Sequence, residues 1–138
     1  MVKRVKREKE REKDTEKYLK LRMRSIGGKA LKWISPGHPG VPDRICFFPP
    51  HAVGSPGPIV FVEVKGEGEA VVPKSNQERT LNLLNDYFGH SCAVIRTKYE
   101  VENLIRVYKE AMNELRGKAK SDSSNTIQEQ QDPTDSTG

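Results

Sequence analysis

Cysteine and long apolar runs are both scarce in this sequence, and their scarcity excludes several kinds of protein. Only two cysteines, Cys46 and Cys92, occur among the 138 residues. Each lies in a short apolar segment, which favours small buried thiols over a disulfide framework and excludes a structural zinc site. No run approaches the roughly 20 apolar residues that a membrane-spanning helix needs, and the N-terminus is a mixed-charge segment rather than a signal segment. We therefore expect a soluble protein of the cytoplasm, with no membrane partner.

Charged residues, in contrast, are plentiful and unevenly distributed. The chain carries 24 Lys and Arg against 19 Asp and Glu, a formal net charge of +5. Residues 1–14 form a basic arm that we expect to be partly helical, and the polar composition of residues 117–138 predicts a disordered tail. Nearly all the hydrophobic side chains lie in residues 15–116, so we expect one domain there. Its positive charge suits a polyanionic partner but is also common on ordinary protein surfaces.

Apolar periodicity within residues 15–116 predicts alternating helices and strands. The predicted strands are residues 30–35, 44–48, 59–65 and 91–96, and the predicted helices run through residues 16–26, 75–88 and from near residue 98 to 115. Ser75 and Glu78 match a capping box, and Gly89 ends the helix that they begin. The strand, helix, strand passage over residues 59–96 requires a parallel crossover. The sequence therefore predicts an α/β (α+β) fold with a mixed sheet flanked by helices.

Two acids and a lysine stand out on the second and third predicted strands. Side chains alternate along a strand, so Glu63 and Lys65 share one face, and Asp43 approaches Glu63 if the two strands pair. Two buried acids this close repel each other unless a cation lies between them. Mg²⁺ suits the pair, because it binds carboxylate oxygens and completes its shell with water, substrate phosphate or a backbone carbonyl such as that of Val64. With Lys65 placed to orient or deprotonate a water, or to neutralise charge on a phosphate, the pattern predicts metal-assisted phosphodiester hydrolysis.

Plainer interpretations of these residues exist. Glu63 and Lys65 could form an ion pair on an edge strand, which contributes little to stability. The apolar run around them favours a central strand instead, where charges need a purpose. Asp43 alone could be a turn residue after Pro42. Taken together, the three residues favour a metal site.

Three further residues are candidates for nucleic-acid binding. His38 lies in a Pro- and Gly-rich loop, where a phosphate contact is possible but an ordinary loop residue is the simpler interpretation. Lys29 and Lys32 precede that loop and are either contacts to a nucleic-acid backbone or ordinary surface lysines.

Short motifs around the acidic pair follow one another in a recognisable order. They are Gly40-Val41-Pro42-Asp43, then Glu63-Val64-Lys65, then Gln77 after Lys74-Ser75-Asn76, all preceded by Glu16 in the first predicted helix. This arrangement, which extends over about residues 16–105, resembles the PD-(D/E)xK nuclease superfamily and specifically the VRR-NUC (virus-type replication-repair nuclease) family.

The resemblance implies a restriction-endonuclease-like αβββαβα core and assigns a role to each matched residue. Asp43 and Glu63 are then metal ligands and Lys65 is the catalytic lysine. Glu16 is an accessory acid near the metal, and Gln77 is a positioning residue at a helix start. Without the resemblance, Glu16 could be one more charge on a solvated helix and Gln77 an ordinary residue of a helical N-terminus.

The resemblance also implies an activity and partners. It implies a Mg²⁺-dependent endonuclease acting on DNA, with Mn²⁺ able to substitute and no small-molecule cofactor, in a bacterial or phage-infected cytoplasm. Small free-standing members of the family are similar to archaeal Holliday junction resolvases, so a homodimer that nicks branched DNA is expected. The absence of a zinc finger, a second domain or an added recognition helix favours recognition of shape and backbone. A flap or single-strand nuclease and a non-catalytic nucleic-acid-binding module remain as alternatives.

Overall fold

The computed structural model of this chain describes residues 7–130. Its elements are α1 (Glu12–Ser25), β1 (Lys29–Lys32), β2 (Arg44–Phe47), β3 (Ile59–Val64), α2 (Asn76–Asn82) with a π-helical turn η1 (Leu83–Tyr87), β4 (Ser91–Ile95) and α3 (Lys98–Gln130). This order confirms the predicted αβββαβα arrangement. None of the helices in the described part is long and apolar enough to cross a membrane.

The four strands form one mixed sheet in the order β1-β2-β3-β4. β1, β2 and β3 pair antiparallel, whereas β4 pairs parallel to β3 after the crossover through α2. Arg44 lies opposite Val62 in the β2–β3 register. The next pair along this antiparallel register is Asp43 and Glu63, which brings the two acids to the same end of the sheet.

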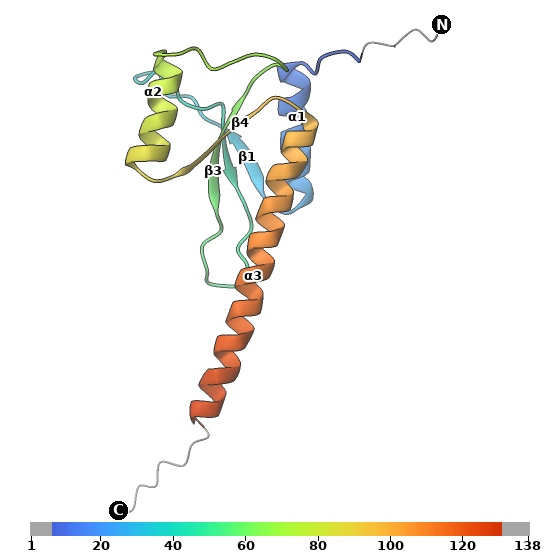
Figure 1. The fold of residues 1–138 in the computed structure, drawn as a ribbon, viewed down its shortest axis with the longest axis vertical. Helices are drawn as coiled ribbons and strands as arrows, with labels where there is room; N and C mark the ends of the chain where they lie inside the picture. The colour runs from blue at the N-terminus through green and yellow to red at the C-terminus, as the bar shows by residue number, and fades with distance from the viewer. Residues whose placement is uncertain (1–6, 131–138) are drawn as a thin grey trace, which may run out of the picture.

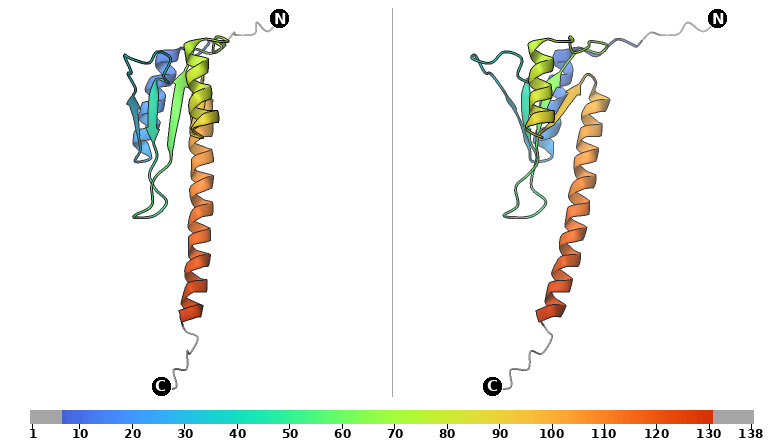
Figure 2. Two further views of the ribbon diagram at one scale, coloured as in Figure 1. Left: turned by 90° about the vertical axis from the view of Figure 1, so that its left-hand side faces the viewer. Right: turned by 60° about the vertical axis from the view of Figure 1, so that its left-hand side comes forward.

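Helices cover both faces of the sheet. α1 and α3 lie on one face and α2 lies on the other, as Figures 1 and 2 show. Because alternate residues of β3 point to opposite faces, Val62 and Val64 face α1 and α3, while Phe61 and Glu63 face the side of α2. The core between the sheet and the α1–α3 layer consists of Leu19, Met23, Cys46, Phe48, Val62, Val64, Ile95, Val101 and Ile105.

The C-terminal end of the chain differs from the sequence expectation, whereas the N-terminal arm is helical in part. α3 is 33 residues long and continues through Gln130. Residues 117–130, which the sequence predicts to be part of a disordered tail, are therefore helical. Residues 131–138 lie outside the described part. The first proline after Pro73 is Pro133, so nothing between them removes a helical N–H group. Only the last three residues of the predicted basic arm, 12–14, are helical, and residues 1–6 lie outside the described part.

The second helix ends in a wider turn than its periodicity predicts. The Phe88 N–H donates to the Leu83 carbonyl oxygen at 3.0 Å, which is the five-residue spacing of a π-helical turn. This turn changes the angular position of the residues that follow. As a result Phe88, which the sequence places on the apolar stripe of the helix, is 55% exposed.

A close contact at Gly40 fixes the loop between β1 and β2 against the start of α2. Gly40 has φ +91°, and a Cβ at this position would lie 2.5 Å from both the carbonyl carbon and the carbonyl oxygen of Asn76. Only glycine accommodates both the backbone angle and the contact. The loop that leads to Asp43 is thereby held against the helix that carries Gln77.

We predict that Gly40→Ala lowers the free energy of unfolding by at least about 2 kcal/mol, because the added methyl group combines backbone strain with a clash against backbone atoms. Denaturant titration followed by circular dichroism measures the change. Gly37→Ala is the matched control, since a Cβ at Gly37 meets nothing within 4 Å. Equal stabilities of the two variants would contradict this account of the Gly40 contact.

Candidate active site

Asp43, which is half-buried, and Glu63, which is buried, form an acidic pair where β2 begins and β3 ends. The Val64 N–H donates to Asp43 Oδ2 at 2.9 Å, which ties the Asp43 side chain to the neighbouring strand. The Glu63 side chain is only 4% exposed. Its Oε2 atom is buried and has no hydrogen-bond partner within the described part of the chain, so the pair contains an oxygen that lacks a ligand.

Burial and the adjacent acid set the protonation of Glu63. Loss of hydration, followed by the negative charge of Asp43 and a hydrogen bond between the two carboxyl groups, raises the pKa of Glu63 to about 8. The charge of Lys65 and a contact with the Gln77 side chain act in the opposite direction but do not offset this rise. A carboxylate pair of this kind is stabilised in its charged form by a cation.

Lys65 lies beside the acidic pair on the same face of β3. Its Nζ atom is 3.9 Å from Glu63 Oε1, and its side chain is 19% exposed. The Lys65 N–H donates to the Ile95 carbonyl oxygen at 2.9 Å, so the β3–β4 ladder holds the backbone that carries the lysine. The ammonium group therefore lies at the edge of the site, where it is partly accessible to solvent.

Gln77 reaches the same site from the first turn of α2. Ser75 Oγ accepts a hydrogen bond from the Glu78 N–H at 3.2 Å, as the capping box predicts. Glu78 Oε1 accepts from the Lys74 N–H at 3.2 Å instead of from Ser75. Both bonds fix the start of the helix, so the Gln77 side chain approaches Glu63 from a defined backbone position.

The first helix carries two acids on one side, Glu16 and Glu12, and the role of Glu16 as accessory acid stays a prediction. The carboxylate of Glu16 forms an ion pair with Arg44, with both guanidinium contacts at 2.8 Å. Glu12, one turn earlier, lies near enough to Asp43 for the two negative charges to act on each other. Partial burial and the negative charges of Asp43 and Glu69 raise the pKa of Glu12, although the residue as a whole is exposed. The four-residue spacing, which places Glu12 and Glu16 on the same side of a helix, was the signal that could have identified it.

The candidate nucleic-acid contacts lie apart from one another. His38 is exposed, and its Nε2 atom is 3.2 Å from Thr80 Oγ1 on α2. Lys29 and Lys32 are exposed at the two ends of the edge strand β1. Their role in binding a nucleic acid stays a prediction, as does that of the Val64 carbonyl in binding a metal.

The chemistry of the acidic pair fits the binding of a divalent metal ion. No set of three or more His, Cys, Asp or Glu side chains within residues 7–130 is arranged to hold a metal, which is unlike a structural site made only of protein ligands. Mg²⁺ usually takes one or two carboxylates and fills its remaining positions with water and phosphate oxygens. The unpartnered Glu63 Oε2 next to Asp43 matches that requirement.

Comparisons with known proteins agree with this geometry. No family model matches the sequence. A protein named "Putative nuclease p44" from Acyrthosiphon pisum secondary endosymbiont phage 1 is 44% identical over 68 residues, which span 49% of this chain and 67% of that protein. A solved structure described as a VRR_NUC domain is 30% identical, covers 70% of this chain and 96% of its own length, and superposes with a TM-score of 0.57.

These matches are at least 30% identical and cover 67% and 96% of the relatives' own lengths. The chain belongs to the VRR-NUC family of nucleases.

Proposed function

We propose that this protein is a divalent-metal-dependent, structure-selective DNA endonuclease that hydrolyses phosphodiester bonds. The observation that carries the proposal is the Asp43–Glu63 pair with a buried, unpartnered oxygen, beside the Lys65 ammonium group. Mg²⁺ is the ion we propose, with Mn²⁺ as a substitute, because both bind oxygen ligands.

Each residue of the site has a defined task in this hydrolysis. Asp43 and Glu63 hold the ion, which when bound supplies Lewis-acid stabilisation of charge on the phosphate oxygens. Lys65 orients the attacking water and offsets the negative charge that develops on the phosphate. A water oxygen forms a bond to phosphorus and gives up one proton, the P–O bond to the leaving sugar breaks, and that sugar oxygen takes up one proton, so the number of protons is unchanged. Gln77 positions the Glu63 carboxylate, and Glu16 is the accessory acid that the first helix supplies near the site.

We further propose that two copies associate through the open part of the sheet. On the side of α2, the register places Leu31 beside Ile45 and Phe47 beside Ile59. Leu31 is 49%, Phe47 39% and Ile59 46% exposed. Figure 2 shows β1 and β2 extending beyond the part of the sheet that α2 covers. A second copy offers an equally apolar face, and pairing removes both from water.

A homodimer of this kind explains the proposed preference for branched DNA. A two-fold assembly presents two active sites, which match the two strands that must be cut in a four-way junction. A flap or single-strand nuclease needs one site only, and a module that binds without cutting needs none.

We expect wild-type protein to nick labelled four-way junctions in Mg²⁺ or Mn²⁺ but not in EDTA, and Lys65→Ala to be at least about 100-fold slower because transition-state charge is no longer offset. Gel analysis of junction, flap, duplex and single-stranded DNA measures this. Lys109→Ala, which removes an exposed lysine of α3, controls for loss of charge. Metal-dependent cutting of only flaps or single strands would show that these, and not four-way junctions, are the substrate. A protein that cuts none of these DNAs would contradict the proposed activity.

The raised pKa of Glu63 predicts a pH-dependent stability in EDTA. Because the folded-state pKa lies near 8 against an ordinary 4.5, the folded protein binds more protons than the unfolded chain between these values. Its free energy of unfolding should therefore fall as the pH rises from 4.5 to 8. Glu63→Gln removes this dependence and is more stable than wild type at pH 8, as thermal denaturation measures.

Adding Mg²⁺ provides the second half of that test. The wild-type Tm at pH 8 should rise with Mg²⁺, because only the folded state offers the acidic pair to the ion. The Glu63→Gln variant should show a much smaller rise, since one ligand charge is missing. An equal rise in both proteins would contradict a metal site at Glu63.

The proposed homodimer predicts a change in mass. Phe47→Glu places a charge in the apolar face and should convert the dimer to a monomer in light-scattering measurements, because burying an unpaired carboxylate is costly. Val53→Glu, which alters a fully exposed loop residue, should stay dimeric. A wild-type protein that is monomeric at micromolar concentration would contradict the assembly.

A further inference from the structure

The outward side of α1 carries four basic residues in one row. Lys13, Lys17, Lys20 and Arg24 are all exposed, and we call them the α1 basic stripe. Successive helical residues are about 100° apart, so their spacing of four, three and four places all four within an arc of about 60°. The opposite side of the helix carries Thr15, Leu19 and Met23, which are buried.

None of the acids of α1 forms an ion pair with a residue of the stripe, although Asp14 lies close to Lys13 and lines a groove beside the stripe. Glu12 lies near Asp43, Glu16 pairs with Arg44, and Asp14 accepts from Arg11 at 3.0 Å. None of the ion pairs formed among the side chains of residues 7–121 involves a residue of the stripe. Arg22, which lies outside the stripe, is paired with Glu102 at 2.5 Å. The stripe therefore presents positive charge that is not held in ion pairs.

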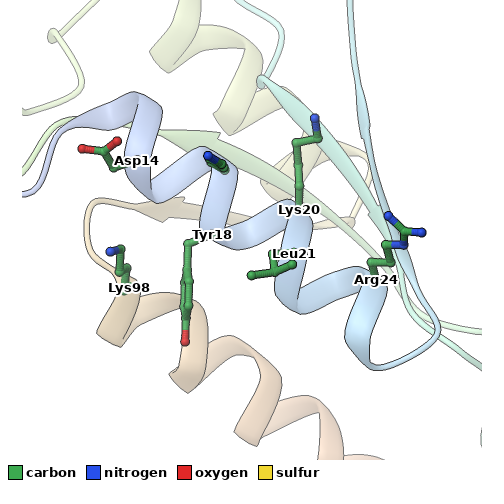
Figure 3. A pocket seen from close by; sticks show the side chains of 7 residues that line it. Asp14, Tyr18, Lys20, Leu21, Arg24 and Lys98 are labelled. Carbon is green, nitrogen blue, oxygen red and sulfur yellow. The ribbon is translucent and has the colours of Figure 1, made fainter.

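A groove runs beside the stripe between α1 and the start of α3. It has a volume of about 510 Å³. Figure 3 shows Lys20 and Arg24 extending from α1, with Lys98 approaching from α3 and Tyr18 and Leu21 between them. Lys98 Nζ is 5.7 Å from the centre of the Tyr18 ring, and Leu21 is 63% exposed. The positive charges complement the phosphates of a DNA strand, and the apolar side chains of Tyr18 and Leu21 between them complement the deoxyribose rings that join the phosphates.

We propose that the α1 basic stripe and Lys98 form a second, non-catalytic surface that binds the phosphodiester backbone of duplex DNA. With a rise of 1.5 Å per residue the stripe is about 16 Å long, which corresponds to about five base-pair steps of a duplex. Contacts of this kind position a substrate without reading its sequence. This inference rests on the proposed function and deepens it, because it names a place where the chain holds DNA apart from the residues that cut it.

The test compares two triple variants that remove the same charge. One is Lys17→Ala, Lys20→Ala, Arg24→Ala in the stripe. The other is Lys109→Ala, Lys118→Ala, Lys120→Ala, which changes exposed residues of α3. Alanine is the strongest helix former, so both variants should keep the fold. A second stripe variant with glutamine at the same three positions guards against an effect of the alanines themselves.

Binding of a short fluorescein-labelled duplex is measured by anisotropy over a range of salt concentrations in EDTA, so that no cleavage occurs. Each lost phosphate contact reduces the slope of log K against log salt by about 0.9. We expect the stripe variants to bind at least about tenfold more weakly, with a slope smaller by about 2 to 3. The α3 variant should change the slope by less than about 1.

Equal effects of the two triple variants would overturn the inference, because long-range charge would then account for both. Unchanged binding by the stripe variants would also overturn it, and so would a wild-type protein that does not bind duplex DNA. A wild type that binds as expected but cleaves nothing in Mg²⁺ would refute the proposed activity and leave the stripe in place. Metal-dependent cleavage by the wild type, together with unchanged DNA binding by the stripe variants, would support the proposed activity and refute the role of the stripe.

Discussion

The Asp43 carboxylate accepts a hydrogen bond from the Val64 N–H, and the acidic pair depends on this bond. Asp43 lies just before β2, where the strand ladder would otherwise stop. The Trp33 N–H donates to the Asp43 carbonyl oxygen at 2.9 Å, whereas the Asp43 side chain accepts from the Val64 N–H of β3. Hydrogen bonds from the chain on both sides of Asp43 therefore hold this residue in place. Because Glu63 precedes Val64, the bond that fixes Asp43 also fixes the distance between the two acids.

The residues around this pair are held by bonds of the same type. Lys65 is fixed through its backbone to β4, Gln77 through the caps of α2, and the loop before Asp43 through the contact of Gly40 with Asn76. Flexible side chains thus extend from rigid backbone positions. Three elements that are distant in sequence keep the site in one arrangement, even though Glu63 Oε2, a buried carboxylate oxygen without a hydrogen-bond partner in the described part of the chain, opposes folding.

Much of this arrangement could be predicted from the sequence, because strand alternation and hairpin pairing are local properties. The alternation in residues 59–65 places Glu63 and Lys65 on one face of the strand. It places the alternate apolar residues Val62 and Val64 on the other face, in the core. The ion pair of Glu16 with Arg44 could not be predicted, since it depends on where Arg44 projects from a neighbouring strand. The exposure of Phe88 was equally inaccessible, because a π-helical turn has no clear sequence signal.

The length of α3 has a consequence for how fast its backbone amide hydrogens exchange with solvent. At 1.5 Å per residue, a helix of 33 residues is about 50 Å long, and Figure 1 shows that it continues well beyond the end of the sheet. Within residues 98–121, the last side chain with a hydrogen bond outside the helix is that of Arg116, to the His51 carbonyl oxygen. Amide hydrogens beyond this point exchange through local fraying, whereas those near Val101 and Ile105 require opening of the core. One continuous helix therefore spans both the least and the most protected amides of the chain.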